Sequence, residues 1–396
     1  MPGIYNLKGI VKHYDWGGTS FIPALLKVEN KSKKAFAEYW MGTHTLGESM
    51  VETGGNIPTG LSVIAGKLPY LFKVLDVKNM LSIQVHPSKE AAEKEFAREN
   101  AEDIPLDSPT RNYKDDNHKP ELMVALSDFW LLHGFKPAEE LLYTLLNVVE
   151  LRELLPIFNQ SGYAGLYKHV MEMPQEEVNR ILQPLIDNIV AINAEGQQDK
   201  QDEDFWAARA AQTFSKDSNI DRGIFSIYLF NLVHLKKGEG IFQDAGVPHA
   251  YLEGQNVEIM ANSDNVLRGG LTSKHIDVKE LLKHVKCEAT IPAIIKNEKT
   301  DGDEKFYKTG VADPKVIGFQ LSVFELQAGE TISFTPDTVE ILLLTEGVVE
   351  LDDDNMAIKL QKGNPSAVVF PGQVVFLAAA AKSTVFKASA PVNSRE

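Results

Sequence analysis

The chain has 396 residues, enough for two or three domains, and its 43% hydrophobic and 24% charged residues are ordinary for a globular protein. It has no run of eighteen apolar residues, no signal-peptide core and a single cysteine, Cys287, so we expect no membrane partner, no internal disulfide and a cytoplasmic location. A formal net charge of −15 argues against nucleic acid as the main partner, but a few well-placed cations could still bind an anionic small molecule.

The first third of the chain has the pattern of a β-rich domain. Residues 4–85 consist of short apolar segments broken by Gly, Pro and Asn. We expect one strand over residues 68–76 and the next over residues 81–86. Ser88 can cap the helix rich in Ala, Glu and Lys that follows. Strand character returns over residues 118–135.

The middle of the chain has a helical pattern. Residues 138–155 and 178–192 carry Leu, Ile and Val at the spacing of a buried helix face. We therefore predict a helical insertion over residues 137–221. It interrupts a β domain made of residues 1–136 and 222–296.

Strand character is expected to resume after the insertion, at Gly223 in GIFSIYLFNLVHL. Further along, His249 and Tyr251 occupy alternate positions of a predicted strand, so both side chains point to one face of a sheet. Glu253-Gly254-Gln255 is expected to form a turn, with Glu258 beyond it.

The last hundred residues are predicted to form a separate all-β domain. A charged linker at residues 297–305 precedes four hydrophobic segments at hairpin spacing, which are typical of a sandwich or barrel over residues 297–396. All ten histidines lie at or before His284. We therefore expect no metal site in this domain.

Four side chains with metal-binding chemistry lie on predicted strands. Gln84 and His86 alternate on one strand, and His249 lies on another. Glu121 follows Pro120, which favours extended backbone before it. This set of nitrogen and oxygen ligands suits Zn²⁺ with one open position, although Fe²⁺, Mn²⁺ or Co²⁺ could also bind. Taken singly, each residue has an ordinary structural interpretation.

These residues lie within motifs that resemble a known family. The segment Tyr113–Glu121, YKDDNHKPE, fits the signature Y-x-D-x-N-H-K-P-E of type I mannose-6-phosphate isomerases, or phosphomannose isomerases, of the cupin superfamily. The stretch His249–Lys274 resembles their second signature, with Gly269 where alanine is common and Ser273 where proline is common. The resemblance covers roughly residues 5–285 and includes the further segments Tyr14–Gly17, Ala37–Gly42 and Leu81–Pro87.

The resemblance implies a mainly β fold of two cupin-type jelly rolls, with an α-helical domain inserted in the catalytic one, and one zinc ion. Carried over by motif, the zinc ligands are Gln84, His86, Glu121 and His249. The residues implied around the substrate pocket are Asp15, Trp16, Glu38, Lys73, Ser82, Lys119, Tyr251, Glu258, Asp264, Arg268 and Lys274. Structural alternatives stay open, since the aromatics could be core residues and the acids could be ion-pair partners of Lys73 and Arg268. We interpret His118 and His133 as structural.

The activity that the resemblance implies is the metal-dependent, reversible isomerisation of mannose 6-phosphate and fructose 6-phosphate. The reaction moves a proton between C1 and C2 through a cis-enediol, so it needs a base and positive charge beside an oxyanion. Glu258 is the first choice for the base, with Asp264, His86 and a metal-bound water as alternatives. Catalytic roles fall to Arg268, Glu258, Lys119 and Asp264, and substrate contacts to Trp16, Glu38, Lys73, Ser82, Tyr251 and Lys274. Arg268, Lys274 and Lys119 are the cations available for the phosphate.

Two other functions remain open. The chain could be a cupin that binds a sugar phosphate without turnover. It could also be an iron oxygenase, because His13-x-Asp15 with a distant histidine resembles a facial triad. The triad would leave Gln84, His86 and Glu121 without a role. We expect the protein to act as a monomer.

Overall fold

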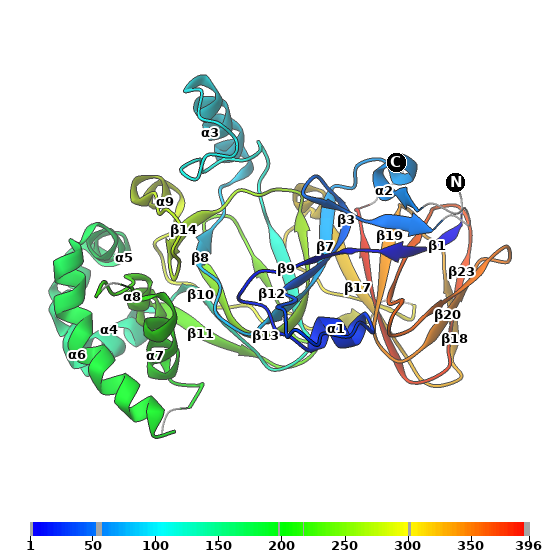
Figure 1. Ribbon diagram of the computed structural model, residues 1–396. Helices are drawn as coiled ribbons and strands as arrows, with labels where there is room; N and C mark the ends of the chain where they lie inside the picture. Colours follow the sequence, from blue (N-terminus) through cyan, green and yellow to red (C-terminus); the bar gives the residue numbers. More distant parts are fainter. Residues whose placement is uncertain (1–2, 53–57, 197–198, 217, 300–301, 392–396) are drawn as a thin grey trace.

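The computed structural model describes residues 3–52, 58–196, 199–216, 218–299 and 302–391. Its strands pair in three antiparallel sheets, and most of its helices gather at the end of the molecule opposite the C-terminal strands (Figure 1). The mainly β, cupin-like fold class is confirmed, with 34% strand and 28% helix.

The sheet that carries the predicted site has eleven strands. They are β2 (Ile10–Lys12), β3 (Glu38–His44), β4 (Gly47–Glu48), β7 (Tyr70–Val77), β8 (Ile83–Val85), β9 (Glu121–Ala125), β10 (Phe129–Phe135), β11 (Phe230–Leu235), β12 (Gly240–Gln243), β13 (His249–Ala261) and β14 (Leu267–Gly270). The inner face packs Leu75, Met123 and Leu131 into a hydrophobic core below the site.

Strand β13 connects the two halves of this sheet. Its first residues pair with β8 and β10, and from Gly254 onward it pairs with β7 and β9. The turn expected at residues 253–255 is therefore wrong, because the strand continues through it. Gly254 instead allows a change of partner, with a φ of +134° and no room for a Cβ, which would lie 2.6 Å from the Phe129 ring.

The helices of the middle segment pack against the β10 and β11 end of this sheet (Figure 1). They are α4 (Ala138–Asn147), the 3₁₀ helix η1 (Val149–Leu154), α5 (Leu155–Glu172), α6 (Gln175–Ala194), α7 (Glu203–Phe214) and α8 (Gly223–Leu229). The strand expected from Gly223 is wrong for its first half, which forms α8. Every residue of α8 is buried. The segment therefore lacks the exposed polar positions that distinguish helical from strand periodicity.

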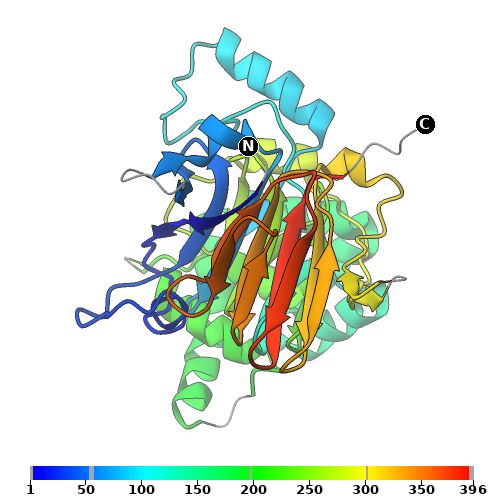
Figure 2. The same ribbon diagram turned by 90° about the vertical axis from the view of Figure 1, so that its right-hand side faces the viewer.

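The C-terminal strands form a second jelly roll made of two sheets. C-terminal strands of this jelly roll lie side by side, facing the viewer, in Figure 2. Its nine-stranded sheet runs β15 (Glu298–Lys299), β16 (Glu304–Phe306), β17 (Gln320–Leu326), β24 (Ser383–Ser389), β19 (Glu340–Glu346), β22 (Ser366–Val369), β1 (Ile4–Lys8), β5 (Met50–Glu52) and β6 (Thr59–Gly60). The four-stranded sheet is β18 (Thr331–Phe334), β23 (Val375–Ala379), β20 (Val349–Asp352) and β21 (Ala357–Leu360). Strand β1 therefore pairs with β22 of the last hundred residues, Asn6 opposite Ala367.

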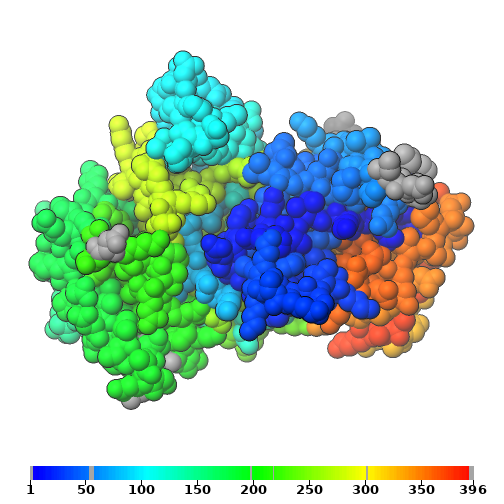
Figure 3. All heavy atoms as spheres, in the orientation of Figure 1, coloured from blue at the N-terminus to red at the C-terminus, as the bar shows by residue number. Residues whose placement is uncertain are grey.

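The described residues form five further helices: α1 (Phe21–Leu25), α2 (Leu61–Ala65), α3 (Lys89–Ala101), α9 (Val278–His284) and α10 (Pro314–Ile317). Helix α3 projects from the body of the molecule (Figure 1, Figure 3). Ser88 accepts a hydrogen bond from Ala91 N at its start, as expected for a cap. No helix in the described ranges combines the length and hydropathy needed to span a membrane. We propose the domain division 1–136 with 222–296, 137–221 and 297–396, with β1, β5 and β6 crossing into the C-terminal sheet.

Candidate active site and metal centre

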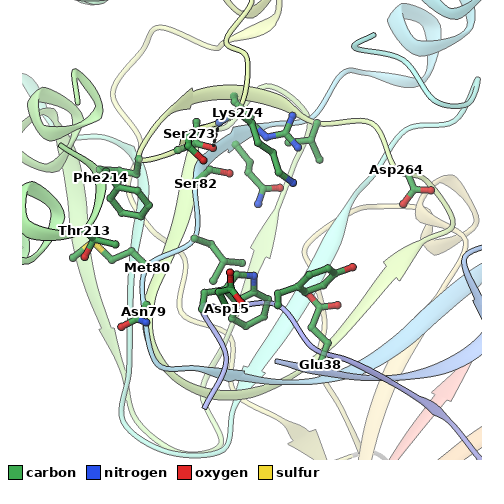
Figure 4. A pocket seen from close by; sticks show the side chains of 18 of the residues that line it. Asp15, Glu38, Asn79, Met80, Ser82, Thr213, Phe214, Asp264, Ser273 and Lys274 are labelled. Carbon is green, nitrogen blue, oxygen red and sulfur yellow. Dashed lines mark hydrogen bonds between the residues drawn. The ribbon is translucent and has the colours of Figure 1, made fainter. Parts of the chain in front are cut away.

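A cavity of about 680 Å³ opens beside the 11-stranded sheet, within the range of small-molecule sites. In Figure 4, Ser82, Ser273 and Lys274 lie at one end, Asp15 and Glu38 at the other, and Thr213 and Phe214 form a side wall. The predicted residues on its walls are Asp15, Trp16, Glu38, Lys73, Ser82, Gln84, Lys119, Asp264, Arg268 and Lys274. A smaller cavity of about 60 Å³ shares part of this wall and adds Glu121, His249, Tyr251 and Glu258.

Three of the predicted metal ligands converge at the smaller cavity, which Glu121 and His249 line. One ligand atom each from His86, Glu121 and His249 lies within 4.8 Å of the others, and all three residues are buried. Nε2 of His86 is 3.5 Å from one Glu121 oxygen, and Nε2 of His249 is 3.4 Å from the other. Gln84 lines both cavities and pairs in register with His249, so its amide belongs to the same face. Two imidazoles, a carboxylate and an amide oxygen form a donor set that suits zinc.

In both imidazoles, Nδ1 is engaged by a backbone carbonyl, so Nε2 remains available to bind a metal ion. Nδ1 of His86 lies 2.8 Å from the carbonyl oxygen of Asn265, and Nδ1 of His249 lies 3.0 Å from that of Val247. Because a carbonyl only accepts, each Nδ1 carries the proton and each Nε2 presents its lone pair toward Glu121. Nε2 of His86 is buried and has no hydrogen-bond partner in the described part of the chain.

The protonation states also fit a metal centre. Burial lowers the pKa of His86 to about 4, against the opposing effect of Glu121, so the ring is neutral at neutral pH. Burial alone would raise the pKa of Glu121, but Lys119 and the two imidazoles outweigh it and hold that pKa well below its usual range. Neutral imidazoles and an ionised carboxylate are the states that bind Zn²⁺.

Behind the metal ligands lies a buried group of three polar side chains. Lys73 Nζ is 3.1 Å from one oxygen of Glu258, and the Tyr251 hydroxyl donates to the other at 2.7 Å. Burial and then Glu121 raise the pKa of Glu258, while Lys73 opposes the rise. The pKa of Lys73 is raised because Glu258, Glu38 and Glu121 outweigh burial. The structure thus contains the predicted Glu258–Lys73 ion pair, in which the acid retains a raised pKa.

Two of the predicted cations, Arg268 and Lys274, line the cavity and have no ion-pair partner among the described residues. Arg268 pairs in register with Gln84, so the two side chains project from adjacent strands. Burial lowers the pKa of Arg268, and burial together with Arg268 lowers that of Lys274. Within the described residues neither forms an ion pair, in contrast to Lys119, whose Nζ is 3.1 Å from Glu121. Unpaired positive charge on a cavity wall favours an anionic ligand.

The comparisons with known proteins agree with this geometry. A family model of the phosphomannose isomerase type I catalytic domain matches residues 4–138. The mannose-6-phosphate isomerase of Shigella flexneri is 36% identical over 391 residues, with 93% of each chain covered. The chain belongs to the type I mannose-6-phosphate isomerase family. The human mannose-6-phosphate isomerase is 33% identical over 410 residues, covering 91% of this chain and 92% of its own length.

The fold of the family is present throughout the chain. The crystal structure of mannose 6-phosphate isomerase from Salmonella typhimurium, bound to substrate (fructose 6-phosphate) and zinc, is 31% identical and superposes with a TM-score of 0.85. The match covers 98% of this chain and all of that one. A second crystal structure of mannose 6-phosphate isomerase, in its holo, zinc-bound form, also superposes with a TM-score of 0.85.

The remaining acids of this family member differ in their surroundings. Asp264 lines the main cavity, with one oxygen 3.5 Å from Nε2 of the buried His44. Glu38 accepts a hydrogen bond from the Trp40 indole, and no ion pair joins it to Arg268 among the described residues. His13 is exposed, with Nδ1 2.6 Å from the Ala35 carbonyl oxygen. The facial-triad interpretation lacks support, because the metal-binding group found among the described residues does not include His13.

Sequence reasoning missed a wall of the cavity. Thr213, Phe214 and Lys216 at the end of α7 line it, although they lie far from every motif of the family. Arg209 explains their position, because its guanidinium donates to Glu253 of β13 and to the carbonyl oxygen of Lys78 and thereby holds α7 against the sheet. The helical insertion predicted over residues 137–221 includes α7, but no local signal indicated which surface this helix would meet.

Proposed function

We infer that the chain is a mannose-6-phosphate isomerase, which interconverts mannose 6-phosphate and fructose 6-phosphate in a metal-dependent reaction. Family membership and the fructose 6-phosphate and zinc in the Salmonella relative support this function. The observation that carries it is the buried cluster of His86, Glu121 and His249 beside a cavity whose wall includes Arg268 and Lys274. We assign His86, Glu121, His249 and Gln84 as the residues that hold zinc.

The reaction needs a stabilised oxyanion, because a proton on carbon beside a carbonyl is only weakly acidic. Zinc, when bound, supplies Lewis-acid stabilisation of several kcal/mol. Lys119 lies beside Glu121 and faces the cavity, so it adds fixed positive charge that stabilises the oxyanion. Arg268 lies opposite Gln84 on the neighbouring strand and lines the same cavity.

Glu258 is the proposed base for the transfer between C1 and C2. Its raised pKa keeps its basicity closer to neutral pH than that of an ordinary glutamate. The Tyr251 hydroxyl and the Lys73 ammonium orient the carboxylate from behind the metal ligands. Asp264, on the opposite wall, is proposed to bind a substrate hydroxyl, and it remains the alternative base.

The phosphate is proposed to bind at the end of the cavity marked by Lys274, Ser82 and Arg268, where the two cations supply positive charge and Ser82 supplies a hydroxyl donor. Trp16, Glu38 and the remaining predicted residues would contact the sugar. All of these walls come from one chain, and we propose that the protein acts as a monomer in the cytoplasm.

The test uses zinc-loaded protein and mannose 6-phosphate in D₂O, followed by NMR. Wild type should form fructose 6-phosphate and incorporate deuterium at the transferred position. Glu258→Gln should bind zinc and substrate but lose both product and incorporation, whereas Asp264→Asn should retain incorporation. Loss of incorporation in Asp264→Asn alone would make Asp264 the base. No product from zinc-loaded wild type would refute the function itself.

A further inference from the structure

The side-chain amide of Asn265 is buried, and its hydrogen bonds all go to a single loop. Asn265 is 1% exposed and follows Asp264 in the turn before β14. Its Oδ1 accepts hydrogen bonds from Lys114 N at 2.7 Å and from Asp115 N at 3.3 Å. Its Nδ2 donates to Asp115 O at 2.8 Å, to Asn117 O at 2.8 Å and to the Asp115 carboxylate at 3.2 Å. Every one of these bonds ends on residues 114–117.

The loop held in this way leads directly into the metal centre. Two residues after Asn117 comes Lys119, and two residues later Glu121 begins β9. The ladder of β9 fixes Glu121 from its C-terminal side. Within the described chain, the Asn265 amide is therefore a principal anchor of the ligand from its N-terminal side. The carboxylate of Asp115 reciprocates by accepting from Asp264 N at 2.8 Å.

The main chain of the same residue holds another ligand. The carbonyl oxygen of Asn265 accepts from Nδ1 of His86, which sets the tautomer of that ring. One residue thus connects the segments that bring His86 and Glu121 together, although His86 lies 179 positions and Asp115 lies 150 positions away in sequence.

We propose that Asn265 is a positioning residue of the metal centre: its amide locks the 114–117 loop against the carbonyl group that orients His86, so that both ligands reach one ion. Only an amide of this size can do so, because Oδ1 must accept while Nδ2 donates to two carbonyls. An aspartate would keep the acceptor contacts but would lose the donors and place a second carboxylate beside Asp115.

The test is a competition of each variant with a chromophoric chelator for Zn²⁺. Outer-shell partners of a metal ligand typically contribute about 10- to 100-fold in affinity. Asn265→Ala and Asn265→Asp should therefore bind zinc about 10- to 100-fold more weakly than wild type. Asn262→Ala is the matched control: the same residue type in the same turn, whose side chain donates to Leu68 O, away from the ligands. It should change zinc affinity less than about 3-fold.

Circular dichroism and thermal unfolding of the metal-free proteins separate positioning from general stability. Zinc affinity within 3-fold of wild type in Asn265→Asp would overturn the proposal, as would an Asn265→Asp protein that no longer folds. The proposal rests on the proposed function in one respect only, because that function identifies zinc as the biologically relevant ion. Wild type that binds zinc without turnover would refute the function, while the affinity comparison would still decide the role of Asn265.

Discussion

Replacing Lys73 by methionine tests the buried ion pair at the centre of the site. Lys73 and Glu258 are 6% and 2% exposed, and their charged atoms are 3.1 Å apart. Methionine keeps most of the side-chain volume but removes the charge. Breaking a buried pair is costly because it leaves the partner charge uncompensated. We therefore expect Glu258 to take up a proton in the folded variant.

The size of the effect follows from the pKa of Glu258. The pKa is already raised by burial and by Glu121, and removing Lys73 raises it further. An acid with a raised folded-state pKa adds stability at low pH that is lost as the pH rises. If the folded variant keeps the proton, each pH unit above the ordinary glutamate pKa of about 4.3 costs about 1.4 kcal/mol. The deficit relative to wild type therefore reaches up to about 4 kcal/mol at about pH 7.3 and falls to about 1.4 kcal/mol at about pH 5.3.

Urea unfolding of the metal-free proteins at these two pH values measures the deficit. Lys31→Met serves as the control, because Lys31 pairs with Glu29 on the surface with 81% of its side chain exposed. It should cost less than about 1 kcal/mol at both pH values. A Lys73→Met deficit that is below about 1 kcal/mol at the higher pH, or that does not shrink as the pH falls, would refute the reasoning.

Three further predictions concern single residues. Glu121→Gln should retain well under one zinc per chain after dialysis and lose at least about 100-fold in turnover, whereas Glu29→Gln should change neither; full zinc content in Glu121→Gln would contradict the ligand assignment. Arg268→Met should lower kcat/KM about 100- to 1000-fold, with partial recovery in Arg268→Lys, and unchanged kinetics would exclude substrate contact. Burial lowers the pKa of His133 from 6.5 to about 4, so wild type should lose up to about 3 kcal/mol of stability from this group as pH falls from about 6.5 to 4. In urea titrations His133→Gln should show a correspondingly shallower acid decline; an identical decline would contradict the assignment.

Much of the site was predictable because its chemistry lies in local motifs. Alternation on a strand placed Gln84 and His86 on one face, and the family resemblance joined them to Glu121 and His249. The structure brings the three chargeable ligands together as expected. The connection through Asn265 could not be predicted, because its hydrogen bonds depend on how a distant loop folds back.

The errors in the fold have physical reasons. Every residue of α8 is buried, Ser226 included, so the segment has no exposed positions from which periodicity could separate this helix from a strand. Glycine at position 254 signals either a turn or a change of strand partner, and only the neighbouring Phe129 determines which is realised. Pairing between β1 and β22 depends on contacts some 360 residues apart in sequence, beyond any local pattern.

This last pairing bears on how the protein is made. Asn6 emerges from the ribosome long before Ala367, the residue opposite it in the sheet. At about 5–20 residues per second, the two are separated by roughly 20–70 s of synthesis. During that interval the edge of β1 is open to wrong partners, so a cell that produces this enzyme should rely on chaperones until translation is nearly complete.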